Sequence, residues 1–429
     1  MVPVALSRCA EDRALKIFRL LGLLLLAATL VALSVPLGRR APLSPPALVN
    51  GRAALAILAA GPLRAGAARV QLPDRAPIAG YPARGVASGG PLYARALVLE
   101  AGPVRQILVS IEALLVPGPL EEALVQRAQL GPSACLLLAA THTHSGVGGT
   151  WKNALAEWGG NGRFDAGVER AVVDAAAQAI ASAVAALGPA QLSWGQMEWP
   201  AGPAEARSAG PIDATLTSVR LERPSGARVA TLIDYAMHPT MEPRQARRLS
   251  GDWPGALSAA LEVSGNVALV LQGASGNATW SRSAGTQEAV AARIAAAAQA
   301  LVLSAPATSQ VRLGCEVRLL SLPPAQASSA VPLLLRRGAS NLLSLVAEPY
   351  ALRTTLSLEG LTLLGVPGEP VGALAQGARA GAPGKVAIVG LADGYVGYIE
   401  PPGGTGEAAR TYHGPGLAES LGLWHQAAP

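Results

Sequence analysis

The spacing of hydrophobic positions predicts short buried strands that alternate with longer helices. The runs Val267–Gln272 and Lys385–Leu391 hold almost only apolar residues, which is typical of strands covered on both faces. Alanine-rich stretches with a helical period separate such runs, and Asp165 precedes the longest of them in the N-cap position. The chain is therefore predicted to be mixed α/β, with largely buried β-sheets flanked by helices.

The expected elements follow from these two periods. Each expected strand is a short apolar run. These strands are Ala94–Leu99, Gln106–Ile111, Ala134–Ala140, Leu216–Leu221, Val229–Ala236, Val267–Gln272, Leu361–Val366 and Lys385–Leu391. The helices share a 3.6-residue period and are Leu120–Leu130, Asp165–Gly188, Pro254–Val263, Thr286–Leu303 and Val371–Arg379.

The N-terminal part of the chain predicts a membrane anchor. Leu20–Gly38 is an uncharged run of 19 residues, close to the ~20 that span a bilayer as a helix. Segment 1–19 is basic, so the positive-inside rule places it in the cytoplasm. A proline-rich linker, 39–51, then leads to a body, 52–429, on the outer side of the cytoplasmic membrane. The alternative is a cleaved signal peptide and a secreted body, although the run exceeds the usual length of about 7–15 residues.

Composition narrows the class of protein. Hydrophobic residues make up 50% of the chain and charged residues 14%, which excludes a disordered protein. The net charge is +6, but residues 1–50 hold six basic and two acidic side chains, so the remaining body carries only +2. No basic block interleaved with aromatics occurs there, which argues against a nucleic-acid partner. Arginine greatly outnumbers lysine, as in proteins from GC-rich bacterial genomes.

The cysteines form no metal-binding spacing. Cys135 and Cys315 could pair in an oxidising compartment. Cys135 lies in the apolar run Cys135–Leu138, however, and this environment favours a buried free thiol.

Candidate chemistry follows the expected strand ends, where α/β folds place their sites. His142 and His144 come after one buried strand, and in an extended segment their side chains point to the same side. His238 ends a second strand, and Glu369 stands in a rigid Pro-Gly-Glu-Pro turn after a third. Taken singly, these fragments also fit surface histidines, a core histidine and an exposed turn acid. Together they predict one polar site of a zinc hydrolase.

A series of motifs adds a family resemblance. They occur in order along the chain: Ile78-Ala-Gly-Tyr81, Leu92-Tyr-Ala-Arg-Ala96, Leu108-Val-Ser-Ile-Glu112, Thr141-His-Thr-His-Ser-Gly146, Met237-His-Pro-Thr240, Ser250-Gly-Asp-Trp-Pro-Gly255, Gln272-Gly-Ala-Ser-Gly-Asn277, Val366-Pro-Gly-Glu369 and Tyr395-Val-Gly-Tyr398. In these segments the chain resembles the N-terminal catalytic domain of the neutral/alkaline non-lysosomal ceramidase family.

The resemblance implies roles for particular residues. It implies that a zinc ion is bound by four ligands, namely His142, His238, Glu369 and Tyr398. It also implies that His144 and Arg207 contact the reacting amide and its oxyanion while a metal-activated water attacks the carbonyl.

One departure bears on the substrate. The family carries a serine needed for ceramide hydrolysis where this chain has Thr279, in the segment 276–280. The leading hypothesis is a membrane-anchored zinc amidohydrolase that acts on ceramide or a related N-acyl lipid. The alternatives are a catalytically silent lipid-binding or scaffold relative, and a hydrolase of a different amide or ester.

Overall fold

The structure is a computed structural model that describes Gly22 and residues 55–82, 84–131, 135–327, 331–402, 413–414 and 416–423. Segment 1–19, the apolar run Leu20–Gly38 except for Gly22, and the linker 39–51 lie outside the described residues. Within the part of the chain that is described, no helix is long and apolar enough to cross a membrane.

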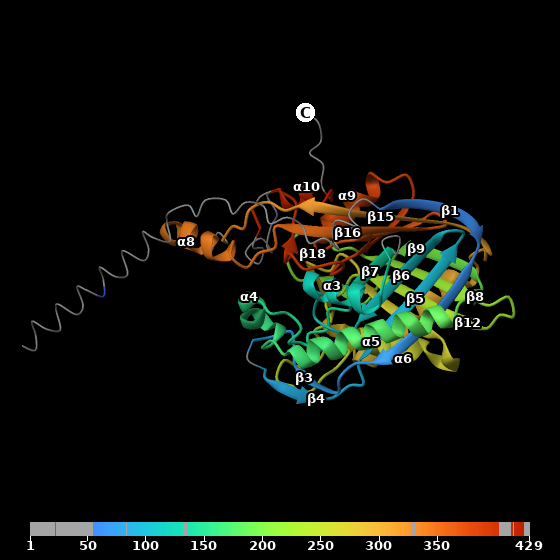
Figure 1. Ribbon diagram of the computed structural model, residues 1–429, viewed down its shortest axis with the longest axis horizontal. Coiled ribbons are helices and arrows are strands. Elements are labelled where there is room, and N and C mark those ends of the chain that lie inside the picture. The colour runs from blue at the N-terminus through green and yellow to red at the C-terminus, as the bar shows by residue number, and fades with distance from the viewer. Residues whose placement is uncertain are drawn as a thin grey trace, which may run out of the picture.

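Three large sheets form the body (Figure 1). The first runs in the order β7 (Cys135–Ala140), β6 (Val104–Ile111), β5 (Tyr93–Ala101), β2 (Arg64–Gln71) and β8 (Gly188–Pro189). The second runs in the order β13 (Val267–Gln272), β12 (Arg228–Tyr235), β11 (Thr215–Glu222) and β9 (Gln191–Glu198). The third runs in the order β1 (Ala56–Pro62), β15 (Gln310–Ser321), β16 (Tyr350–Leu358), β17 (Leu361–Gly365) and β19 (Lys385–Val389).

Each large sheet contains one parallel pair at an edge, while its other pairs are antiparallel. The parallel pairs are β6–β7, β12–β13 and β17–β19. Three two-stranded sheets complete the fold: β3 (Arg75–Pro77) with β4 (Val86–Ser88), β10 (Ala204–Ala206) with β14 (Ala278–Trp280), and β18 (Glu369–Pro370) with β20 (Tyr398–Ile399).

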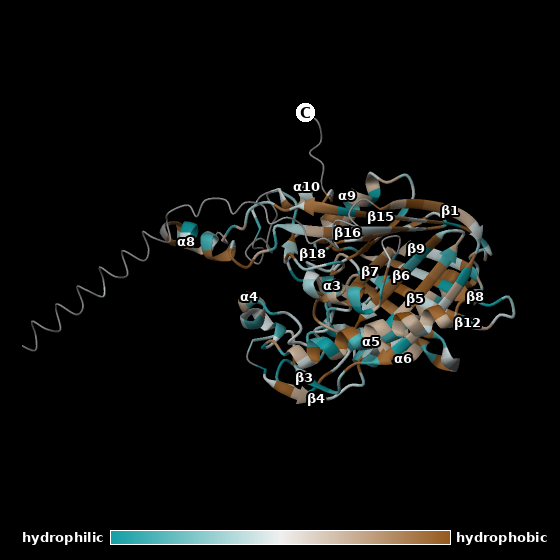
Figure 2. Ribbon diagram, viewed as in Figure 1, coloured by the Kyte–Doolittle hydropathy of each residue, from teal (hydrophilic) through white to brown (hydrophobic). Residues whose placement is uncertain are grey.

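The largest hydrophobic cluster lies between the large sheets. It contains Leu137 of β7, Leu269 of β13 and Leu363 of β17, all fully buried. Because strands of all three sheets contribute, the sheets pack face to face around one core, and their strands are strongly apolar in Figure 2. This burial on both faces explains the nearly continuous apolar runs of the parallel strands.

The expectation of a free thiol at Cys135 is wrong, because a disulfide joins Cys135 of β7 to Cys315 of β15. Their Cα atoms are 6.2 Å apart. An apolar sequence around a cysteine indicates burial, but it carries no information about a partner 180 positions away. The packing of the first sheet on the third brings the two residues together.

Helices cover the outer faces of two sheets. α3 (Gly118–Arg127) and α5 (Ala166–Ala185) lie on the first sheet (Figure 1), and α6 (Asp252–Leu261) and α7 (Gln287–Leu303) pack on the second. The Asp165 side chain caps α5 by accepting hydrogen bonds from Gly167 N and Val168 N. The remaining helices are α4 (Ala154–Ala156), η1 (Glu157–Asn161), η2 (Val263–Gly265), η3 (Arg282–Ala284), α8 (Leu333–Leu343), α9 (Gly372–Ala380) and α10 (Leu417–Ser420). The expectation of a mixed α/β fold with sheets flanked by helices is confirmed.

Candidate metal centre

The carboxyl ends of three strands, one from each large sheet, meet at one point. His142 follows β7, His238 follows β12, and Glu369 follows β17. His142 Nε2 lies 3.2 Å from His238 Nε2 and 3.2 Å from Glu369 Oε2. His238 Nε2 lies 3.1 Å from the same carboxylate oxygen. The structure thus brings together side chains that are more than 200 positions apart in the sequence.

Segment 390–393 ties these strand ends to one another through its backbone. Gly390 N donates to Gln272 O at the end of β13, at 2.7 Å. Leu391 N donates to Gly368 O, and Leu391 O accepts from Ala140 N at the end of β7. The convergence of the strand ends is therefore built into the backbone and does not depend on a bound ion.

Both imidazoles turn Nε2 toward the centre because Nδ1 is held from behind. His142 Nδ1 lies 2.8 Å from Leu114 O, and His238 Nδ1 lies 2.7 Å from Ser275 O. A carbonyl oxygen can only accept, so each Nδ1 carries the proton. Burial lowers the pKa of the His238 imidazole, which favours the neutral ring with a lone pair on Nε2. Backbone carbonyls fix metal-binding histidines in this tautomer.

Tyr398 joins the cluster through the strand pair β18–β20, in which it stands opposite Glu369. Its hydroxyl lies 3.3 Å from His238 Nε2, and its ring is stacked with the imidazole. Burial raises the pKa of the Tyr398 hydroxyl and the neighbouring Glu369 raises it further, whereas the positive charge of Arg207 opposes both. A phenolate at this position therefore requires further positive charge nearby.

The spacing of these atoms fits a small divalent cation. Four ligands placed tetrahedrally at ~2 Å from a zinc ion would lie about 3.3 Å from one another. The distances among the two Nε2 atoms, Glu369 Oε2 and the Tyr398 hydroxyl that are given above range from 3.1 to 3.3 Å. With both Nδ1 atoms protonated, the centre contains two lone pairs and a carboxylate facing each other. The Tyr398 hydroxyl can donate to only one of these acceptors. A buried set of acceptors with too few donors is costly, and a cation would satisfy it.

His144 lies beside this cluster and is only half-buried. Its ring centroid lies 5.0 Å from that of His142 and 5.7 Å from that of His238. Neither ring nitrogen has a hydrogen-bond partner among the described residues, although both are buried. Burial, together with His142 and His238, holds the pKa of His144 well below its usual range. The neutral ring is therefore favoured, although the backbone of Gly80 has a smaller opposite effect on this pKa. One nitrogen from each of the three histidines fits within 4.8 Å, so His144 also lies within reach of a bound ion.

Arg207 follows β10 and contacts the cluster from the side of Tyr398. One of its terminal nitrogens donates to the Tyr398 hydroxyl and to Gly276 O, both at 2.8 Å. Its guanidinium also lies 5.2 Å from the centre of the Tyr398 ring. The guanidinium of Arg207 is thus hydrogen-bonded to one member of the cluster.

Thr279 stands in β14 immediately after Ala278, whose carbonyl oxygen lies 3.1 Å from His238 Nδ1. Thr279 is half-buried and opposite Glu205 in the β10–β14 pair. Among the described residues its hydroxyl has no hydrogen-bond partner in the site. Thr279 therefore follows a residue that contacts His238, and among the described residues no hydrogen bond joins its hydroxyl to His144.

Tyr395 is a site residue that reasoning from the sequence missed. Its hydroxyl donates to Glu369 Oε1 at 2.7 Å, which leaves Oε2 directed at the two histidines. The tyrosine belongs to the motif Tyr395-Val-Gly-Tyr398, so a signal was present, but only Tyr398 was given a role. The carbonyl oxygens of Leu114 and Ser275 were also missed, since backbone acceptors have no sequence signature.

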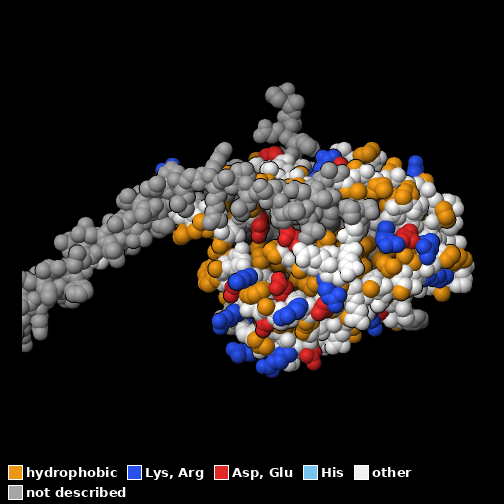
Figure 3. Space-filling model, viewed as in Figure 1, with side chains coloured by type: hydrophobic (Ala, Val, Ile, Leu, Met, Phe, Trp, Pro, Cys, Tyr) orange, Lys and Arg blue, Asp and Glu red, His pale blue; other side chains and the backbone are white. Residues whose placement is uncertain are grey.

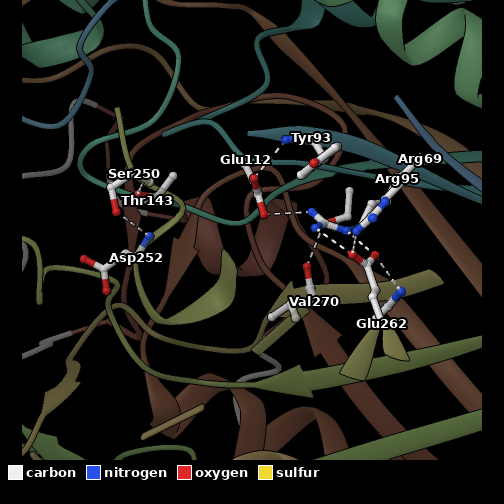
Figure 4. Close-up of polar contacts among 11 residues, drawn as sticks. Arg69, Tyr93, Arg95, Glu112, Thr143, Ser250, Asp252, Glu262 and Val270 are labelled. Atoms are coloured by element: carbon white, nitrogen blue, oxygen red, sulfur yellow. Dashed lines mark hydrogen bonds and ion pairs between the residues drawn. The ribbon is translucent and has the colours of Figure 1, made fainter. Parts of the chain in front are cut away.

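A buried ionic network supports the histidine loop from behind (Figure 4). Arg95 binds Glu112 through Nη1 and Glu262 through Nε, both at 2.7 Å, and Arg69 also pairs with Glu262. Glu112 comes two residues before Leu114, the partner of His142. In the same region the Thr143 hydroxyl donates to Ser250 O at 2.7 Å. The network thus fixes the backbone on both sides of the histidines.

Comparisons with known proteins agree with this fold. Residues 80–277 match the family described as neutral/alkaline non-lysosomal ceramidase, N-terminal. The fold is similar to that of the neutral ceramidase from Pseudomonas aeruginosa, with a TM-score of 0.70 and 20% sequence identity over 84% of this chain and 73% of that chain. A structure described as ceramidase complexed with C2 gives a TM-score of 0.71 and 19% identity over the same shares of the two chains.

A search among curated proteins gave no match to the sequence. The resemblance expected from the motifs is nevertheless confirmed: the chain is similar to the N-terminal part of the neutral/alkaline non-lysosomal ceramidase family over residues 80–277, and to neutral ceramidases in its fold.

Proposed function

We propose that this protein hydrolyses the amide bond of ceramide or a related N-acyl lipid with the help of one zinc ion. The observation that carries the proposal is the convergence of His142, His238, Glu369 and Tyr398 on a single point. Two imidazoles with a carboxylate form a ligand set known from catalytic zinc sites. When bound, zinc would supply Lewis acidity, polarising an amide carbonyl and lowering the pKa of water at the site.

The chain's own residues would divide the remaining work. His144 has a neutral ring with unengaged nitrogens, so it is suited to exchange a proton with the reacting amide. Arg207 keeps Tyr398 oriented by donating a hydrogen bond to its hydroxyl. The positive charge of Arg207 would stabilise the negative charge that develops on the amide oxygen. Tyr395 holds the second oxygen of Glu369 away from the metal position.

The competing candidates are a silent lipid-binding relative and a hydrolase of another amide or ester. Thr279 and Trp280 motivate both, because they replace a segment that the family uses on ceramide. The complete polar set argues against a silent protein, since a buried cluster with more acceptors than donors is unfavourable for mere packing. The identity of the amide that the protein hydrolyses is determined by measuring activity on a panel of N-acyl lipids.

The test is hydrolysis of a panel of N-acyl lipids by the full-length chain in detergent, with and without a chelator. We expect fatty acid release from at least one amide, loss of release after chelation, and recovery with added zinc. Release that chelation leaves unchanged would overturn the metal mechanism. Binding without release from any amide or ester would favour the silent relative.

We further propose that the body, 52–429, acts outside the cytoplasm on a substrate that resides in a membrane. The Cys135–Cys315 disulfide supports an oxidising compartment. The apolar run Leu20–Gly38 supports an anchor, with a cleaved signal as the alternative. Recovery of intact protein in the soluble cytoplasmic fraction would refute this placement.

Replacing Thr279 with serine is expected to raise hydrolysis of ceramide. The extra methyl of threonine restricts its χ1 rotamers. Thr279 follows Ala278, whose carbonyl oxygen contacts His238. Serine would keep the hydroxyl without that methyl, and we expect a several-fold gain in kcat/KM. Steady-state kinetics on ceramide and on one shorter N-acyl amide would measure it. Unchanged rates on both substrates would remove Thr279 from the site.

Replacing Tyr395 with phenylalanine is expected to weaken metal binding by about 10–100-fold, the usual effect of losing a partner of a metal ligand. The variant removes one hydroxyl and leaves Glu369 Oε1 without its 2.7 Å donor. Competition with a chromogenic chelator would give the affinity independently of activity. The matched control is Tyr93→Phe, because the Tyr93 backbone N–H, and not its hydroxyl, donates to Glu112 (Figure 4). Equal affinities in both variants would show that Tyr395 does not position Glu369.

A further inference from the structure

Two arginines lie against one tyrosine at the edge of the site. The ring of Tyr81 has its centroid 5.3 Å from that of His144. The guanidinium of Arg244 lies 4.8 Å from the Tyr81 centroid, and that of Arg84 lies 5.6 Å from it. Tyr81 is half-buried and Arg244 is exposed. Both guanidinium groups thus lie against Tyr81, the residue whose ring contacts His144.

Neither positive charge is neutralised by a carboxylate within ion-pair distance among the described residues. Arg84 is 9% exposed, and its terminal nitrogens donate to uncharged oxygens of Ala79, His144, Ser145 and Ala246. Its Nε is buried and has no hydrogen-bond partner. Glu242 acts on Arg84 only from beyond ion-pair distance. A buried guanidinium without a directly paired carboxylate is unfavourable, so its presence next to a reaction centre points to an anion that arrives with the substrate.

Two buried acids lie near the arginines and Tyr81, and both have other partners. The carboxylate of Asp252 accepts hydrogen bonds from the backbone N–H groups of Glu242 and Trp253. Glu242 stands on the same loop as Arg244, but both of its carboxylate oxygens accept hydrogen bonds from Arg248, at 2.8 and 2.9 Å. Arg244 therefore keeps its charge available. Figure 3 shows basic side chains interspersed with acidic ones on the surface around β3 and β4, the strands that flank Arg84 in the sequence.

The distances limit where the anion would stand. The guanidinium of Arg244 lies no more than about 10 Å from the centre of the His144 ring, since Tyr81 is 4.8 Å from one and 5.3 Å from the other. An amide held between His144 and the metal ligands would need its anionic group within a few bonds of the amide nitrogen to form an ion pair. Ceramide has no such group, because its amine half is neutral.

We propose that the substrate carries a carboxylate or phosphate on its amine half and that Arg244 binds this group beside Tyr81. This inference rests on the proposed amide hydrolysis and names its substrate class: N-acyl amino acids or phosphorylated N-acyl amino alcohols. Arg84 contributes by the field of its buried charge and by holding the His144 backbone through a 2.6 Å hydrogen bond. Bidentate binding of such anions by arginine is strong and geometrically selective.

The test uses three lauroyl amides that differ only in the amine half: N-lauroylglycine, the phosphate ester of N-lauroylethanolamine, and N-lauroylethanolamine itself. With the zinc-loaded full-length chain we expect at least one anionic amide to have a kcat/KM about tenfold or more above that of the neutral amide. The Arg244→Ala variant should lose about 10–100-fold on that amide and less than about threefold on the neutral one. Arg244→Lys should restore part of the loss.

The matched control is Arg247→Ala, which removes the same charge from the same loop but contacts neither Tyr81 nor His144 in the described structure. It should leave all three rates within about threefold of wild type. A preference for the carboxylate or for the phosphate would identify the source of the anion. A wild-type preference for the neutral amide, or equal losses on all three amides in Arg244→Ala, would overturn the inference.

Failure of the proposed function can be told apart from failure of this inference. If no amide is hydrolysed, the proposed function fails, and calorimetric binding of N-lauroylglycine then decides the inference by itself. Binding that is at least tenfold weaker in Arg244→Ala than in wild type and Arg247→Ala would support the anion site. Equal binding in the three proteins, or no binding to any of them, would refute it.

Discussion

Replacing His142 with alanine is expected to abolish hydrolysis of every substrate, with kcat/KM reduced by about 10³-fold or more. The side chain supplies one of the two Nε2 atoms at the centre, 3.2 Å from the other. Loss of the metal removes several kcal/mol of transition-state stabilisation, and each 1.36 kcal/mol is worth about tenfold in rate. The rate of fatty acid release at saturating zinc measures the effect.

The matched variant is His144→Ala, two residues along the same loop. His144 has no bonded ring nitrogen, and we place it on the substrate side of the centre. Its removal should also slow hydrolysis strongly, but the protein should still bind metal, whereas His142→Ala should not. If both variants lose metal, His144 is a ligand. If His142→Ala retains wild-type activity, the centre is not the site of hydrolysis.

Replacing Arg95 with methionine is expected to lower the free energy of unfolding by about 3–5 kcal/mol, the usual cost of breaking a buried ion pair from one side. Arg95 is 2% exposed and bridges Glu112 to Glu262 (Figure 4). Methionine fills much of the space but leaves two carboxylates without their shared partner. Urea denaturation followed by circular dichroism would give the free energy.

The control for Arg95 is Arg105→Met. Arg105 pairs with Glu100 at the surface, where its side chain is 48% exposed, so its loss should cost less than about 1 kcal/mol. Because Glu112 adjoins the loop that bonds His142, the Arg95 variant should also bind metal more weakly than the Arg105 variant. Equal stability of the two variants would show that the buried network contributes no more than a surface ion pair.

The elements that the sequence predicted well are those in which burial is nearly complete. The run Val267–Gln272 coincides with β13, and the helix expected to begin after Asp165 is α5. The hydrophobic pattern does not predict strands that have one exposed face. β15 alternates buried positions with charged ones such as Arg312 and Arg318, so its apolar period is interrupted.

The strand β2 was not predicted because most of its side chains are short or charged. β2 is rich in alanine and arginine, and its Gly66 is essential for packing: a Cβ there would lie 2.1 Å from Ala183 O of α5. Such close approach of a helix to a strand cannot be inferred from the hydrophobic pattern. It is a property of the tertiary structure.

In the candidate site, too, some residues are predicted by the sequence and others depend on the tertiary structure. His142, His238 and Glu369 were found because rare polar residues follow apolar runs, which mark strand ends. Tyr398 came only from the family motif, and its place opposite Glu369 depends on the short β18–β20 pair. The supporting hydrogen bond of Tyr395 and the carbonyl of Leu114 depend on the assembled fold.

The most direct test of the metal centre is the metal content of the full-length chain. The protein is purified in detergent without a chelator, and its metals are measured by inductively coupled plasma mass spectrometry. We expect one zinc per chain in the wild type and in His144→Ala, and none in His142→Ala. Wild-type protein that releases fatty acid from an N-acyl lipid while containing no divalent metal would contradict the proposal, as would a zinc content that His142→Ala leaves unchanged.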